Sequence, residues 1–153
     1  MRAVCLFLAM GCASWLAAAA AAPIPKTLRK DVPDDRAKLV GTWEMVTIST
    51  ESGTVGIDGG LELRVPDEHG KAVYAIGGLP ETTCVITMIP NDSPKSLDWT
   101  FDDSGGPVAY QCVYELSDSK LVIVRRLTNT DDRPNSCVAG QKGCVLYEFE
   151  RKK

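Results

Sequence analysis

Histidine is nearly absent from this sequence: His69 is the only one in 153 residues. A single imidazole excludes metal sites built from several histidines and leaves little for histidine acid–base catalysis. A basic surplus is also lacking, because 17 Lys and Arg residues stand against 20 Asp and Glu residues, for a net charge of -3. Proteins that bind a phosphate backbone carry clustered positive charge, so we expect no nucleic-acid partner.

The usual motifs for metal ions are missing as well. The sequence contains no CxxC knuckle for zinc and no Asp-x-Asp-x-Asp-Gly loop for calcium. Carboxylates do occur close together in two places, namely at Asp98, Asp102 and Asp103 and at Asp131 and Asp132. Aspartates at turns are ordinarily solvated. We therefore expect no bound metal and no cofactor.

The first 22 residues have the three parts of a secretory signal peptide. Arg2 supplies the positive start, Val4–Met10 the apolar run, and Ala17–Ala22 the small-residue cleavage region. We therefore expect a signal peptide over 1–22 and a secreted or periplasmic protein.

Two further features concern the same part of the chain. Leu8–Cys12 loosely matches a bacterial lipobox, so the alternative is a lipoprotein anchored to a membrane through Cys12. Residues 23–38 are polar and contain three prolines, which predicts a linker ending in about one helical turn. The remaining residues, 39–153, have the composition of one folded domain.

Export changes the meaning of the cysteines outside the signal peptide. An even number of cysteines in an oxidising compartment favours disulfides over thiolate chemistry, and four cysteines allow three pairings. We favour Cys84–Cys112, which lie in two strand-like runs, and Cys137–Cys144, which suit a short clip across a loop. Zinc held by four thiolates is the alternative.

From residue 40 onward, short alternating apolar runs are separated by Gly, Pro, Asn and Asp, which is typical of an all-β domain. Sustained helical periodicity is missing, which disfavours α/β architectures. We expect eight strands: Gly41–Thr50, Leu61–Val65, Ala72–Ile76, Thr82–Ile89, Ser96–Phe101, Val108–Leu116, Lys120–Leu127 and Cys144–Glu150.

The strands have one apolar and one polar face, as half-buried antiparallel strands do. Tyr110, Cys112 and Tyr114 share one face of their strand, and Tyr147 shares a face with Phe149. Eight such strands have edges to cover, and closure into a small barrel covers them most completely. The prediction is a small eight-stranded antiparallel barrel, with a two-sheet β-sandwich as the alternative.

Several short motifs follow one another between Leu39 and Arg151. They are Gly41-Thr42-Trp43, Pro94-Lys95-Ser96-Leu97-Asp98, Tyr114-Glu115-Leu116, Leu121-Val122-Ile123, Arg133-Pro134 and the segment from Leu146 to Arg151. Together they resemble a family of small secreted lipocalin-like domains that is expanded in planctomycete bacteria and has no established activity. The resemblance implies a lipocalin-like barrel and export, with no catalytic residues. The chain departs from the pattern at Lys120 and at Asn135–Cys137.

Aromatic residues are the candidates for a ligand cavity. Trp43 and Trp99 are placed to line the interior of a barrel, and Tyr114 belongs to the inward face of the central hairpin. Packing of these rings in a filled core is the alternative. Arg125 and Arg126 are expected at solvated strand positions, with one of them a possible partner for a carboxylate under the barrel mouth.

These observations lead to three functional hypotheses. The first is an exported, non-enzymatic β-barrel protein that binds a small apolar ligand or an envelope protein. The second is an envelope structural or interaction module with a filled core. The third is a hydrolase at the Asp103-Ser104-Gly105-Gly106 turn, which is similar to the nucleophile motif of chymotrypsin-like proteases but has only His69 as a distant imidazole.

Overall fold

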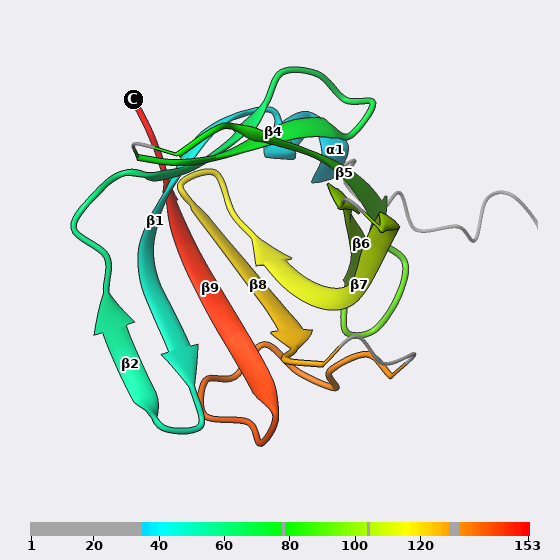
Figure 1. Cartoon of the computed structure of the whole chain (residues 1–153). Coiled ribbons are helices and arrows are strands. Elements are labelled where there is room, and N and C mark those ends of the chain that lie inside the picture. Colours follow the sequence, from blue (N-terminus) through cyan, green and yellow to red (C-terminus); the bar gives the residue numbers. More distant parts are fainter. Residues whose placement is uncertain (1–34, 78, 104, 129–131) are drawn as a thin grey trace, which may run out of the picture. The chain divides into compact units, whose positions relative to one another are not determined.

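The computed structural model describes residues 35–77, 79–103, 105–128 and 132–153 (Figure 1). The predicted signal peptide over 1–22, Cys12 and the linker up to residue 34 lie outside the described residues, as do Ser104 and Asp131. In the described part of the chain, no helix has the length and apolar character needed to cross a membrane.

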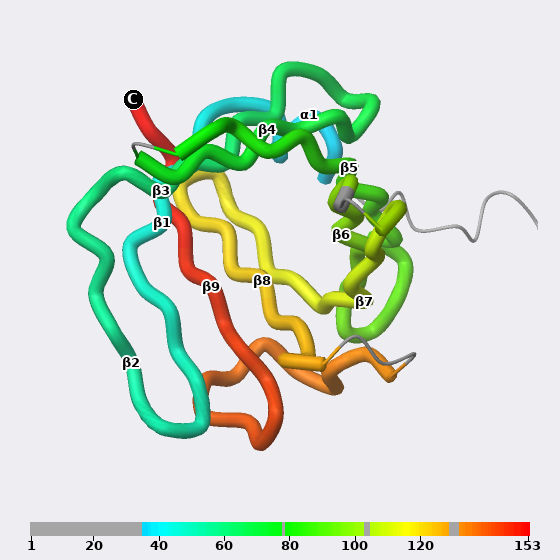
Figure 2. The backbone as a smooth tube through the Cα atoms, viewed as in Figure 1, coloured from blue at the N-terminus to red at the C-terminus, as the bar shows by residue number. Residues whose placement is uncertain are grey.

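One short helix and nine strands follow one another along the described chain (Figures 1 and 2). They are α1 (Asp35–Leu39), β1 (Gly41–Thr50), β2 (Gly53–Gly56), β3 (Leu61–Val65), β4 (Lys71–Ile76), β5 (Thr82–Ile89), β6 (Ser96–Asp103), β7 (Gly106–Leu116), β8 (Lys120–Arg126) and β9 (Cys144–Arg151). The eight predicted strands and the helical turn before residue 40 are thereby confirmed.

The strands close into a barrel. Neighbours from β3 to β9 pair antiparallel, and both β3 and β9 pair with β1. The ladder that closes the barrel runs from Trp43 opposite Arg151 to Thr50 opposite Val145. The result is the predicted closed eight-stranded antiparallel barrel, with one extra strand, rather than a two-sheet sandwich.

The extra strand, β2, was not predicted from the sequence. Its four residues begin and end with glycine, which is depleted in strands, and all four are exposed. The strand forms because β3 covers only the first half of β1, and β2 pairs with the second half, from Thr47 opposite Gly56 to Thr50 opposite Gly53. This pairing depends on the tertiary arrangement and not on local propensity.

Side chains alternate between the barrel interior and its outer surface, as predicted. Tyr110, Cys112 and Tyr114 of β7 and Tyr147 and Phe149 of β9 all belong to the interior cluster. A second, smaller cluster lies apart from it and consists of Val113, Val122, Val124, Cys144 and Leu146, with Cys137 packed against it. The segment that carries Cys137 therefore covers the outer face of β7, β8 and β9.

The four cysteines of the domain are free thiols, so neither predicted disulfide is formed. Cys84 and Cys112 lie on β5 and β7, and β6 runs between these strands. Cys84 is opposite Phe101 of β6, whereas Cys112 is opposite Leu97, four residues further along. Strands lie about 4.8 Å apart and rise about 3.3 Å per residue, so the two Cα atoms are far beyond the roughly 7 Å limit for a disulfide.

The predicted Cys137–Cys144 bridge is not formed either. Cys137 packs against the outer cluster to which Cys144 belongs, but the two thiols remain unbonded. The segment is held by hydrogen bonds instead, since Gln141 Nε2 donates to the carbonyls of Ser136 and Val138, each at 2.8 Å.

Candidate functional site

Helix α1 and Trp43 close one end of the barrel, called the α1 end below. Trp43 is fully buried, and its indole N–H donates to the carbonyl of Leu39 at 2.7 Å. The Arg151 guanidinium stacks on the Trp43 ring, with Cζ 4.1 Å from the ring centre. Gly41 makes this approach possible, because a Cβ there would lie 2.5 Å from Arg151 Nη1. Trp43 is therefore packed into the closure of this barrel end.

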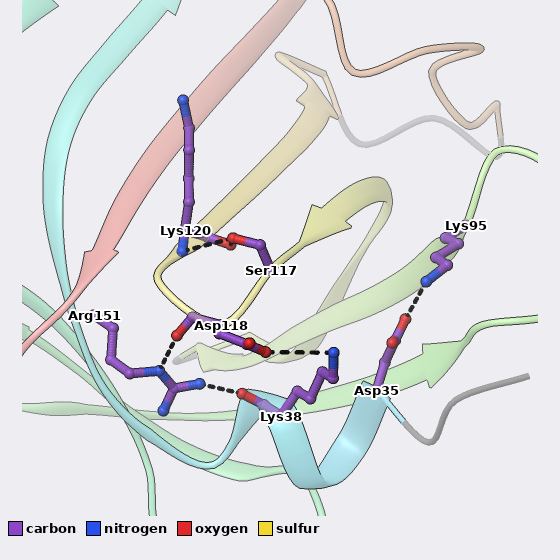
Figure 3. A network of polar contacts seen from close by, with 7 residues as sticks. All are labelled: Asp35, Lys38, Lys95, Ser117, Asp118, Lys120 and Arg151. Carbon is purple, nitrogen blue, oxygen red and sulfur yellow. Dashed lines mark hydrogen bonds and ion pairs between the residues drawn. The ribbon is translucent and has the colours of Figure 1, made fainter.

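A buried carboxylate joins α1 to the barrel wall. Asp35 is 2% exposed, and its Oδ2 accepts hydrogen bonds from Tyr114 Oη at 2.8 Å and Lys95 Nζ at 2.7 Å. Figure 3 shows Asp35 and Lys95 pointing toward each other from α1 and the start of β6. Burial, together with the neighbouring Asp35 carboxylate, raises the pKa of Tyr114 far above its usual value. Tyr114 is therefore a neutral donor that fixes α1.

The last strand is tied to the same end (Figure 3). Arg151 donates from Nε to the carbonyl of Asp118 at 2.7 Å, and its guanidinium also donates to the carbonyls of Lys38 and Val40. Lys38 pairs with the Asp118 carboxylate at 3.3 Å. Asp35, Lys38, Tyr114 and Arg151 at the α1 end thus find their polar partners within the protein.

The opposite end of the barrel interior contains an aromatic cluster, defined as Tyr74, Trp99, Phe101, Tyr110 and Tyr147. Ring centroids of neighbours lie 5.0 to 6.2 Å apart, and four of the five contacts are edge-to-face. Such spacing is favourable for aromatic pairs. Only Trp99 is fully buried, and the other four rings are partly exposed to solvent.

Arg125 of β8 lies against the aromatic cluster. Its Cζ is 4.3 Å from the centre of the Tyr110 ring and 5.6 Å from that of Tyr147. Nε donates to Tyr147 Oη at 3.1 Å, and Nη1 donates to the carbonyl of Arg126 at 3.0 Å. Among the residues that the structure describes, no carboxylate forms an ion pair with Arg125. The guanidinium is therefore held by rings and oxygens that leave its charge unneutralised.

The indole N–H of Trp99 is buried without a hydrogen-bond partner. Burial raises the pKa of the neighbouring Cys84 thiol, and the Trp99 indole partly offsets that rise. Sulfur accepts hydrogen bonds only weakly, so the thiol does not satisfy the indole N–H. A buried donor without an acceptor costs about 1–3 kcal/mol, so Trp99 differs sharply from Trp43.

The sequence placed only one of the three cavity candidates at this cluster. Trp99 belongs to it, whereas Trp43 and Tyr114 close the α1 end. The expectation of a solvated position is wrong for Arg125, which is half-buried against rings, and the Nε of Arg126 is buried without a partner. The cluster residues that were missed as candidates are Tyr74, Phe101, Tyr110 and Tyr147. Two of them, Tyr110 and Tyr147, could have been found from the sequence, because they alternate with outward positions on β7 and β9.

The residues of the hydrolase hypothesis lie at different ends of the barrel. Asp102 is near the end of β6, opposite Pro107, beside the aromatic cluster. His69 lies in the connection between β3 and β4, next to Gly70, at the end where α1 packs. Ser104 lies outside the described residues. No group of three or more His, Cys, Asp or Glu side chains suited to a metal occurs among the residues that the structure describes.

A groove of about 620 Å³ runs along the outer face, beside Cys137. Its apolar lining includes Leu116, Val122 and Leu146, and Val138 stands 63% exposed at its margin. Val138 lies on this outer surface and not in the barrel interior, so its substitution is a suitable control for changes in the interior.

Searches against models of protein families, curated proteins and solved structures gave no match to this chain.

Proposed function

We propose that this protein is an exported, non-enzymatic binding module, and that a small ligand with an apolar body binds at the aromatic cluster. The observation that carries the proposal is the contrast in exposure: four aromatic rings that face the barrel interior remain partly open to solvent at one end only. Rings of this kind offer large contact area at low cost in conformational entropy.

Apolar residues next to the cluster support the same proposal. Ile76 follows Tyr74 on the same face of β4 and is 38% exposed, and Leu79 in the following connection is 60% exposed. Exposed apolar residues beside partly exposed aromatic residues favour a site for an apolar ligand. A ligand that covers the ring edges would remove this surface from water.

A neutral naphthalene dye tests the proposal. N-phenyl-1-naphthylamine fluoresces in apolar surroundings and accepts excitation energy from tryptophan, so binding close to the tryptophans of the barrel is read directly. We expect saturable binding of one dye molecule. Phe101→Ala should weaken it about tenfold, since a lost ring contact costs about 1.4 kcal/mol, whereas Val138→Ala on the outer face should leave it unchanged. Absence of saturable binding would favour the second hypothesis, an envelope module with a filled core.

Export and family membership belong to the same proposal and have their own test. The predicted signal peptide over 1–22 and the motifs that resemble the lipocalin-like domains support a location outside the cytoplasm. We expect the mass of the protein taken from its source cell to lack the leader. An added lipid mass on Cys12 would instead identify a lipoprotein, and an intact leader would contradict export.

A further inference from the structure

The aromatic cluster is rich in hydrogen-bond donors and poor in acceptors. Trp99 Nε1 has no partner, and Nη2 of Arg125 makes no hydrogen bond with the described residues. Tyr147 Oη accepts from Arg125 Nε, so its own proton remains free to be donated elsewhere.

Tyr74 brings a second hydroxyl to the same place. Burial raises the pKa of Tyr74, the neighbouring Tyr147 raises it further, and Arg125 lowers it. The Tyr74 ring packs edge-on against Trp99, with the two ring centroids 5.8 Å apart. Trp99, Arg125, Tyr147 and Tyr74 are in contact within one cluster, and each of them carries a group that can donate a hydrogen bond.

Arg133 shows what the protein does with a comparable guanidinium elsewhere. Its side chain is 26% exposed, and Nη2 donates to Asp98 Oδ1 at 2.6 Å while Nη1 donates to the carbonyls of Leu97 and Cys112. Arg133 is thus neutralised by a carboxylate of the same chain and makes three hydrogen bonds within it. Arg125 is also partly buried, but it lacks a carboxylate partner among the described residues.

We propose that the ligand of the aromatic cluster is an organic anion with an apolar body and a single carboxylate, which Arg125 and Tyr147 bind. The inference rests on the proposed function, because it names the chemical class of the ligand at the same site. The carboxylate supplies the acceptors that the chain does not, and charge-assisted hydrogen bonds to a guanidinium are stronger than neutral ones. The apolar body stacks on the partly exposed rings.

A matched pair of competitors tests the inference. 2-Naphthoate and 2-naphthylmethanol share one bicyclic body and differ in the carboxylate, and each is titrated against bound N-phenyl-1-naphthylamine. We expect 2-naphthoate to displace the dye at a concentration at least about tenfold lower, since hydrogen bonds to charged groups contribute about 1.5–3 kcal/mol. Arg125→Gln should abolish this preference, which is a ratio of two displacement concentrations and so does not depend on the affinity for the dye. Lys120→Gln, in a partly exposed ion pair at the α1 end, should leave both the preference and the dye affinity unchanged.

A second, smaller substitution keeps the inference testable if Arg125→Gln fails to fold. Tyr147→Phe keeps the ring and removes only the hydroxyl, so it should lower the preference for 2-naphthoate about threefold to tenfold. Equal displacement by the two competitors, or a preference that survives both substitutions, would overturn the inference while dye binding still supports the proposed function. If the dye itself fails to bind, the proposed function fails first.

Discussion

The two tryptophans of the barrel show how differently its two ends are built. Trp43, at the α1 end, is fully buried, hydrogen-bonded to Leu39 and covered by Arg151. Trp99 is equally buried, yet its N–H has no partner and its neighbours are partly exposed rings and an unneutralised guanidinium. Burial alone therefore does not identify a structural residue. Completeness of the polar contacts separates the end that maintains the fold from the end that is suited to a ligand.

Truncating one large ring at each end should give the largest difference. Trp43→Ala should lower the free energy of unfolding by about 3–5 kcal/mol, because it leaves a cavity in a fully packed region. Phe101→Ala, at a partly exposed ring, should cost about 1–2 kcal/mol. Urea denaturation followed by far-ultraviolet circular dichroism measures both. Equal costs would show that the aromatic end is packed as completely as the α1 end.

Removing the buried carboxylate of the α1 end should have the next largest effect. Asp35→Ala leaves the buried Tyr114 hydroxyl without an acceptor, which should cost about 1–3 kcal/mol, while the partly exposed Lys95 can turn to water. Two matched substitutions sharpen the comparison. Tyr114→Phe should cost about 1 kcal/mol and Tyr147→Phe clearly less, since Tyr147 is partly exposed. The reverse order of the two in the same denaturation assay would contradict the assignment of roles.

The interior between the two ends should respond to alkaline pH. Burial raises the pKa of Cys112 from 9.0 to about 12, with smaller opposing effects from Arg125 and Arg133. Above pH 9 the unfolded chain loses this proton and the folded chain keeps it, so stability falls as pH rises, by at most about 1.4 kcal/mol per pH unit, until about pH 12. Unfolding measured at pH 8 and 10 in wild type and Cys112→Ala isolates this effect. An equal loss in both proteins would show that Cys112 does not contribute.

The disulfide pairing was predicted least well, because it was inferred only from the spacing of the cysteines along the chain. Both Cys84 and Cys112 lie in predicted strands, but β6 pairs between these two strands. The intervening strand places the two thiols out of reach of each other. Arg125 was misjudged for a similar reason. Its position on β8 is clear from the sequence, but the rings of Tyr110 and Tyr147 reach it only after β8 pairs with β7 and β9.

The sequence by itself determined the eight strands of the barrel wall, their inward and outward faces, and the short helix before them. These features follow from local alternation and from turn residues, which act over a few neighbouring positions. Only the tertiary structure decided the pairing of β2 with β1, the closure of one end by Asp35, Tyr114 and Arg151, and the gathering of five rings around Arg125 at the other. Each of these joins residues distant along the chain, and such contacts are set by strand order and register rather than by local preference.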